Sequence, residues 1–92
     1  MTAPRLSVIV PTYNRRQRLG RVLDALGSQT VSPEIFEVVV IDDGSTDGTR
    51  DWLARQTFPF EVRTLSQSNA GPAVARNTGI RAARGELLVF LD

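Results

Sequence analysis

Apolar residues gather in four short runs that are typical of buried β-strands. The runs cover residues 6–10, 36–41, 61–65 and 86–91. The first, second and fourth are almost continuously apolar, and the first two are rich in valine and isoleucine. Such runs indicate strands covered on both faces, as in a parallel sheet. The third run contains several polar residues and gives the weakest strand signal.

Three helical patterns separate these runs. The first covers about residues 15–28, and its apolar stripe consists of Leu19, Val22, Leu23 and Leu26. Asn14 and Gln17 are spaced like a capping box at its start. The second pattern covers about residues 46–56, where Ser45 or Asp47 is a candidate cap.

The third helical pattern covers about residues 72–84. Pro72 suits the first turn of a helix, and Gly85 suits the position just past its end. One face carries only the small residues Ala75, Gly79 and Ala82, which would let this helix lie close to a sheet. The regular alternation of strands and helices predicts an α/β fold with a parallel sheet and helices on both faces.

Composition excludes several kinds of chemistry. The 92 residues include no cysteine, no histidine and no lysine. Their absence rules out thiolate zinc sites, histidine-based triads, Schiff-base catalysis and a lysine-containing phosphate loop. The net charge of +1 is too small to favour nucleic acid as a partner. No apolar run approaches the length of a membrane span, and no secretion signal opens the chain. We therefore expect a cytoplasmic location, although a membrane tether could lie outside this segment.

Each predicted strand is followed by polar residues. These are the segments 11–14, 42–45 and 66–69, with Asp92 after the last strand. In a parallel sheet the carboxyl ends of the strands lie at one edge, where open α/β folds bind their ligands. Four segments distant in sequence are therefore expected to meet at one rim.

The candidate residues on this rim each allow two interpretations. Asp42 and Asp43 could cap the next helix, or accept hydrogen bonds from a base or ribose. Tyr13 could stack on a nucleobase or pack over the first helix. Asn77 interrupts an apolar helix stripe, so partial burial is expected, with either a backbone or a ligand partner. Arg76 is expected to reach solvent, as is the arginine-rich segment 15–18, for which an anion contact is the minority interpretation.

Two other nucleotide-binding classes lack their motifs here. No G-x-G-x-x-G sequence follows a predicted strand, so a Rossmann dinucleotide site is unsupported. A nucleotidyltransferase would show a glycine-rich, lysine-containing loop after its first strand, and none is present.

The order of the remaining motifs resembles the start of a family 2 glycosyltransferase of the GT-A fold. The resemblance covers nearly the whole chain from Leu6. It is carried by SVIVPTYNR at 7–15, SQT at 28–30, VIDDGSTDGT at 40–49, NAGPAVARNTGI at 69–80 and GELLVFLD at 85–92. No single piece is specific, but the combination is.

The resemblance implies an inverting enzyme that transfers sugars from nucleotide-diphosphate donors. Implied donor-binding residues are Pro11, Thr12, Tyr13, Asp42, Asp43, Arg76 and Asn77. Asp92 matches the first carboxylate of the family's D-x-D motif, which holds Mg²⁺ or Mn²⁺. The second carboxylate of that motif would lie two positions later, and the catalytic base and acceptor site later still. The implied architecture is a three-layer, mostly parallel sheet in the order 3-2-1-4.

We therefore expect residues 1–92 to form the N-terminal, nucleotide-binding half of a GT-A domain, with no catalytic residue of its own. Such a chain would bind a nucleotide-sugar donor without transferring the sugar to its acceptor, which the sequence does not identify. The alternative is a non-catalytic nucleotide-binding or assembly module. The apolar fourth strand at the sheet edge also predicts self-association into a homo-oligomer.

Overall fold

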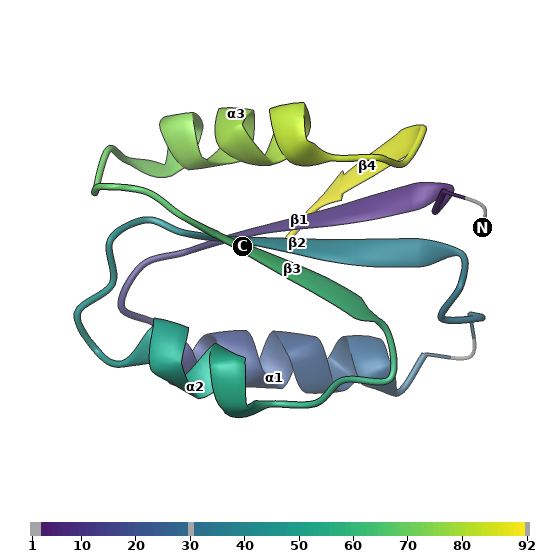
Figure 1. Cartoon of the computed structure of the whole chain (residues 1–92), viewed down its shortest axis with the longest axis horizontal. Coiled ribbons are helices and arrows are strands. Elements are labelled where there is room, and N and C mark those ends of the chain that lie inside the picture. Colours follow the sequence, from purple (N-terminus) through teal and green to yellow (C-terminus); the bar gives the residue numbers. More distant parts are fainter. Residues whose placement is uncertain (1–2, 30, 92) are drawn as a thin grey trace.

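The computed structural model describes residues 3–29 and 31–91 and shows a three-layer α/β fold (Figure 1). In chain order the elements are β1 (Leu6–Thr12), α1 (Arg16–Gly27), β2 (Phe36–Asp42), α2 (Thr49–Arg55), β3 (Glu61–Ser66), α3 (Pro72–Ala82) and β4 (Leu87–Phe90). All strand pairs are parallel, and the strand order is β3-β2-β1-β4. The predicted fold class and strand order are confirmed.

The two faces of the sheet are covered by different helices. Helices α1 and α2 lie on one face and α3 lies on the other (Figure 1). Alternate residues of β1 and β2 enter two separate core clusters, so that Val8 and Val38 face α1 whereas Ile9 and Val39 face α3. Every residue of β2 is buried. This two-sided burial is the physical reason for the continuous apolar runs in the sequence.

Helix α3 approaches the sheet closely through its small residues, as predicted. Ala75 is fully buried, and Gly79 is buried against the side chains of Ile9 and Ile41. A Cβ atom at position 79 would lie 2.8 Å from Cδ1 of Ile41 and closer still to Cγ2 of Ile9. The absence of a side chain is therefore a packing requirement at this position.

The predicted starts of two helices need correction. Helix α1 begins at Arg16, with Arg15 as the N-cap and no side-chain capping bond, so the capping box of Asn14 and Gln17 is wrong. Asn14 instead adopts a left-handed backbone conformation, with φ of 50°, and bonds to the β2–α2 loop. Helix α2 begins at Thr49, later than predicted, because Gly48 has φ of 85°. Asp47 does accept the Thr49 N–H there, at 3.1 Å.

A buried ionic network joins the strands at the amino end of the sheet. Glu37 is completely buried and accepts hydrogen bonds from Ser7 Oγ at 2.6 Å, Arg63 Nε at 3.0 Å and the Arg84 amide at 2.8 Å. The Gly85 amide donates to Ser7 Oγ at 2.8 Å. The network therefore fixes the turn between α3 and β4 against the first three strands.

Among residues 3–29 and 31–91, no helix has both the length and the apolar character that crossing a bilayer requires.

Candidate functional site

The carboxyl ends of the central strands meet at one edge of the sheet, as the sequence predicts. Thr12 pairs in register with Asp42, and Asp42 with Ser66. The loops that follow surround a hollow of about 660 Å³. It is lined by Pro11, Thr12, Tyr13, Arg15, Arg18, Asp43, Asn69, Gly71, Pro72, Ala75 and Arg76. We call this space the rim hollow.

Asp43 organises one wall of the rim hollow. The residue is 4 % exposed, and its Oδ1 accepts hydrogen bonds from Gln67 Nε2 and the Ala70 amide, both at 2.9 Å. Its Oδ2 accepts from the Gly71 amide at 3.0 Å and from Asn69 Nδ2 at 3.3 Å. Burial alone would raise the pKa of Asp43, but the hydrogen bonds from Gln67, Ala70 and Gly71 lower it below its usual value. Asp43 is therefore an ionised acceptor at neutral pH.

Gly71 gives this wall its shape. It is the residue before α3 and has φ of 99°, a conformation that residues with a Cβ rarely adopt. The turn directs its N–H onto Asp43 and places Pro72 at the first turn of α3. The β3–α3 connection thereby closes over the end of β2.

Asp42 has a structural partner and lies outside the rim hollow. It is completely buried, and its Oδ1 accepts the Ser45 amide at 3.0 Å. Its Oδ2 has no hydrogen-bond partner among the described residues. Of the two interpretations of these residues, the structural one therefore applies to Asp42, which shapes the turn. The binding one applies to Asp43, which faces the hollow.

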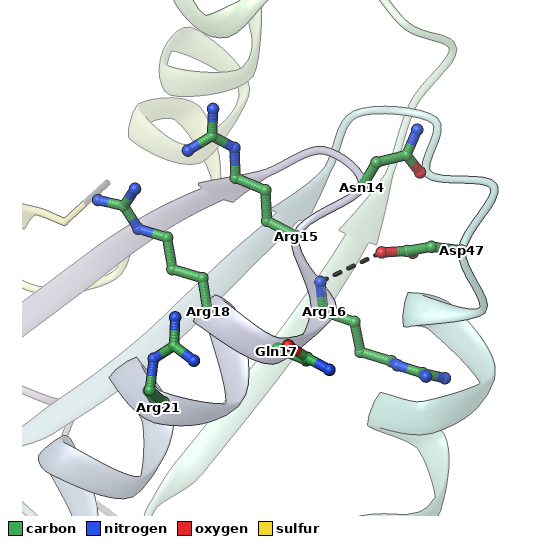
Figure 2. Close-up of a pocket in the computed structure, with 7 residues that line it drawn as sticks. All are labelled: Asn14, Arg15, Arg16, Gln17, Arg18, Arg21 and Asp47. Atoms are coloured by element: carbon green, nitrogen blue, oxygen red, sulfur yellow. Dashed lines mark hydrogen bonds between the residues drawn. The ribbon is translucent and has the colours of Figure 1, made fainter.

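The loop that carries Tyr13 is fastened to the loop after β2. The Asn14 amide donates to Ser45 Oγ at 2.9 Å, and Asn14 Oδ1 accepts the Thr46 amide at 2.7 Å. Asp47 Oδ2 accepts the Arg16 amide at 3.1 Å (Figure 2). These bonds fix the backbone after Tyr13, and the Asp43 amide donates to the Thr12 carbonyl just before it, at 2.9 Å. The Tyr13 side chain itself is 46 % exposed at the hollow. An exposed ring on a fixed backbone is suited to stacking on a planar ligand.

Three arginines line the rim hollow, although each was expected to reach solvent, and only Arg76 is among the donor-binding residues that the resemblance implies. Arg15 and Arg18 line it from the start of α1, and Arg76 lines it from α3. The ion pairs within the described residues involve only Arg63 and Arg84. The guanidinium groups at the hollow are therefore available to an anion. The signal in the sequence was the position of Arg15, two residues after Tyr13 at the end of a strand.

Two predicted site residues remain outside this arrangement, in addition to Asp42. Asn77 is exposed on α3 and does not line the hollow, so its expected partial burial is wrong. Helix α3 instead buries the face that carries Ala75 and Gly79. Asp92 lies outside the described residues. In the part of the chain that the structure describes, no three acidic, histidine or cysteine side chains gather as a metal site.

Comparisons with known proteins agree with the fold and the motif order. A family model described as glycosyl transferase family 2 matches residues 7–92. Validoxylamine A glucosyltransferase of Streptomyces hygroscopicus subsp. limoneus is 50 % identical over 91 residues, which are 97 % of this chain and 20 % of that protein. Glycosyltransferase AglE of Haloferax volcanii is 39 % identical over 94 residues, 99 % of this chain and 31 % of that protein. The chain thus spans about a fifth to a third of these relatives.

Solved structures are similar over the same region. The crystal structure of S. aureus TarS 1-349 in complex with UDP has a TM-score of 0.89 and 36 % identity, over 96 % of this chain and 27 % of that one. Mannosyltransferase PcManGT from Pyrobaculum calidifontis, in complex with GDP-Man and Mn²⁺, has a TM-score of 0.80 and 35 % identity, over 96 % of this chain and 27 % of that one.

Proposed function

This chain belongs to glycosyl transferase family 2, and we propose that its rim hollow binds the nucleoside diphosphate part of an activated sugar donor. The observation that carries the proposal is the meeting of Tyr13, Asp43 and Arg76 at one hollow, from two loops and helix α3 that are far apart in the sequence. The UDP and UDP-GlcNAc complexes of TarS support a nucleotide-sugar donor.

Each group at the hollow has a part in this proposal. The ring of Tyr13 stacks on the nucleobase, and Pro11 and Thr12 line the same hollow from the end of β1. Asp43 accepts an N–H of the base. Arg15, Arg18 and Arg76 place three positive charges around the diphosphate.

Asp43 can accept from a base only by sharing its oxygens. A carboxylate has about four lone-pair positions, and four protein donors already occupy those of Asp43. The longest of these bonds, at 3.3 Å, comes from Asn69 Nδ2, which also donates to the Asp43 carbonyl at 3.0 Å. A base N–H therefore displaces Asn69 most easily, because that amide keeps its second acceptor.

A divalent cation, Mg²⁺ or Mn²⁺, belongs to the same proposal. Family membership and the Mn²⁺ complex of PcManGT support it. Asp92 is the candidate ligand in this chain, and the described residues by themselves do not gather a site that fits the ion. When bound, the ion would neutralise charge on the leaving diphosphate. The described residues contribute the base and phosphate contacts.

We propose that the transfer step, with inversion at the sugar carbon, needs groups that the described residues do not supply. The carboxylate at the hollow, Asp43, is a poor general base because its pKa is lowered. Attack by an acceptor hydroxyl therefore needs a base from outside this hollow, and this chain alone serves to hold the donor.

Calorimetric titration with UDP, GDP and ADP tests this function. We expect at least one nucleoside diphosphate to bind, and Tyr13→Ala to weaken this binding about fivefold or more, because stacking on a base contributes roughly 1–3 kcal/mol. Tyr13→Phe keeps the ring and should keep the affinity. Asp43→Ala is a poorer test, since it also leaves the amides of Ala70 and Gly71 without their acceptor. No binding by any of the three nucleotides, or equal binding by Tyr13→Ala, would refute the proposal.

A further inference from the structure

A threonine and a glutamine behind the wall of the rim hollow form a hydrogen-bonded chain that ends on Asp43. Thr78 Oγ1, on α3, donates to Gln67 Oε1 at 2.7 Å, and Gln67 Nε2 donates to Asp43 Oδ1 at 2.9 Å. We call this chain the Thr78–Gln67 relay. Both side chains are half-buried, and neither is among the residues that line the hollow. They therefore affect a ligand in the hollow only through Asp43.

The chemistry of the three groups sets the direction of each bond in the relay. Asp43 is ionised and only accepts hydrogen bonds, so the Gln67 amide presents its nitrogen to Asp43 and its oxygen to Thr78. The Thr78 hydroxyl has one proton, for which the Val74 carbonyl, at 3.0 Å, is a second acceptor. Inside a helix that carbonyl also accepts the backbone N–H four residues on, and the Gln67 oxygen is nearer to the hydroxyl. The proton therefore points to Gln67.

The relay is held at both ends by secondary structure. The Gln67 amide, directly after β3, donates to the Asp42 carbonyl at 3.0 Å. Thr78 precedes Gly79, the residue through which α3 packs on the sheet. The hydroxyl and the glutamine amide therefore have fixed positions relative to the end of β2. Donors held in place in this way need little ordering when a ligand arrives.

The two oxygens of Asp43 are held unequally. Oδ1 accepts from Gln67 and from the Ala70 amide, both at 2.9 Å. Oδ2 accepts from the Gly71 amide at 3.0 Å and from Asn69 at 3.3 Å, the longest of the four bonds. Burial raises the pKa of Asp43, and of the hydrogen bonds that lower it the one from Gln67 has the largest effect. Oδ1 is thus occupied by two firm donors, whereas Oδ2 gains a free position when Asn69 moves.

We propose that Gln67 and Thr78 are positioning residues for the base of the donor, because their relay occupies Oδ1 of Asp43 and so presents Oδ2 to the base N–H. This step rests on the proposed function, in which Asp43 accepts that N–H. Without the relay the carboxylate is free to rotate, Asn69 bonds to either oxygen, and the single acceptor position for the base is lost. The arginines at the diphosphate do not depend on the relay.

The test compares nucleotides whose bases differ in one ring N–H, by calorimetric titration. UDP and GDP carry this N–H, whereas CDP and ADP have a bare ring nitrogen at the same position of a base of similar size. We expect wild type to prefer UDP to CDP, or GDP to ADP, about tenfold or more, the effect of one hydrogen bond to a charged group. Gln67→Met should reduce this preference to about threefold or less. The variant leaves no buried group unpartnered, since Asp43 Oδ1 keeps the Ala70 amide and Thr78 keeps the Val74 carbonyl.

Two variants of Thr78 and one control separate positioning from packing. Thr78→Val removes the hydroxyl at nearly constant size and should also reduce the preference, whereas Thr78→Ser keeps the hydroxyl and should keep the preference. Gln56→Met is the matched control, because the Gln56 side chain donates to the Trp52 carbonyl of α2 and does not line the hollow. A merely structural role of the relay would weaken all four nucleotides equally and leave their ratios unchanged.

The possible outcomes separate this inference from the donor proposal. Unchanged ratios in Gln67→Met would overturn the inference, as would a wild type that binds nucleotides without preferring a base with the ring N–H. In both cases the donor proposal would stand, since a nucleotide still binds. A chain that binds none of the four nucleotides would refute the donor proposal and the inference together.

Discussion

Two of the buried carboxylates at the ends of strand β2, Glu37 and Asp43, are stabilised in different ways. Glu37, near the amino end, forms ion pairs with Arg63 and Arg84. Asp43, just past the carboxyl end, is held only by amide N–H groups. The negative charge of Glu37 is thus neutralised inside the protein, whereas that of Asp43 remains directed at the rim hollow. This difference suits a structural role at one end and a binding role at the other.

The Glu37 network predicts a loss of stability in acid. Burial alone would raise the pKa of Glu37, but hydrogen bonds from Ser7, the Arg84 amide and Arg63 lower it below the usual 4.5. The unfolded chain therefore takes up the proton first, and the contribution of Glu37 is complete above about pH 4.5 and lost as the pH falls through the folded-state pKa. Glu37→Gln should lower the free energy of unfolding by about 2–3 kcal/mol at pH 7 and flatten this acid slope.

Urea unfolding between pH 3 and 7 measures both effects. Glu86→Gln removes the same charge from an exposed position and should change little. A slope in Glu37→Gln as steep as in wild type would contradict the assignment.

At the scale of elements, strand types and their order could be predicted because two-sided burial imposes continuous apolar runs. The starts of the helices could not be predicted, because they depend on bonds between two loops distant in sequence. The Asn14 amide donates to Ser45, and the Arg16 amide donates to Asp47, each across 31 residues. The Glu37 network was missed, although a glutamate within the apolar run of residues 36–41 was the available signal: a buried charge requires partners. The rim itself was predictable from topology. The place of Arg15 just after Tyr13 was a signal for its lining of the rim, but the lining by Arg18 could not be predicted, because helical periodicity does not give the direction of a long side chain.

The close contact between α3 and the sheet makes Gly79 intolerant of a side chain. Gly79→Ala would press a methyl group against Ile9 and Ile41, which are both completely buried and have no room to move. We expect the free energy of unfolding to fall by about 1–3 kcal/mol. Gly27→Ala is the control, since its Cβ would meet Phe60 at an ordinary 3.7 Å. Chemical denaturation of the two variants checks this, and equal stability would show that α3 lies farther from the sheet.

At the scale of the whole molecule, apolar surface is concentrated on the β4 side. Leu87 is 64 % exposed, and Val89 and Phe90 of the same strand are also exposed. Strand β4 is an edge of the sheet and pairs only with β1 in the described part of the chain. An apolar edge strand with free backbone groups favours pairing with another chain.

We therefore predict that this chain self-associates at high concentration and that Leu87→Lys suppresses the association. Charge on an edge strand opposes edge-to-edge pairing. Sedimentation velocity over a concentration series measures the self-association. Val31→Lys is the matched control, because Val31 is exposed and lies outside the sheet. A wild-type chain that stays monomeric throughout, or equal association in both variants, would contradict the prediction.

Whether the chain can catalyse sugar transfer is also a property of the whole molecule. The chain has no histidine, and Asp43 is a poor base. With a panel of nucleotide sugars and Mn²⁺, we expect release of nucleoside diphosphate no faster than spontaneous donor hydrolysis. Steady release above that background, lost in Asp92→Ala, would show that the chain carries catalytic machinery of its own.

We propose above all that a nucleoside diphosphate binds where the carboxyl ends of the strands meet. Amide NMR spectra recorded during a UDP titration test it directly, residue by residue. We expect the shifted amides to gather at Tyr13, Asp43, Gly71 and Arg76, while those of Glu37 and Arg84 at the opposite edge do not move. Shifts gathered at Glu37 and Arg84, or no shifts at saturating UDP, would contradict it.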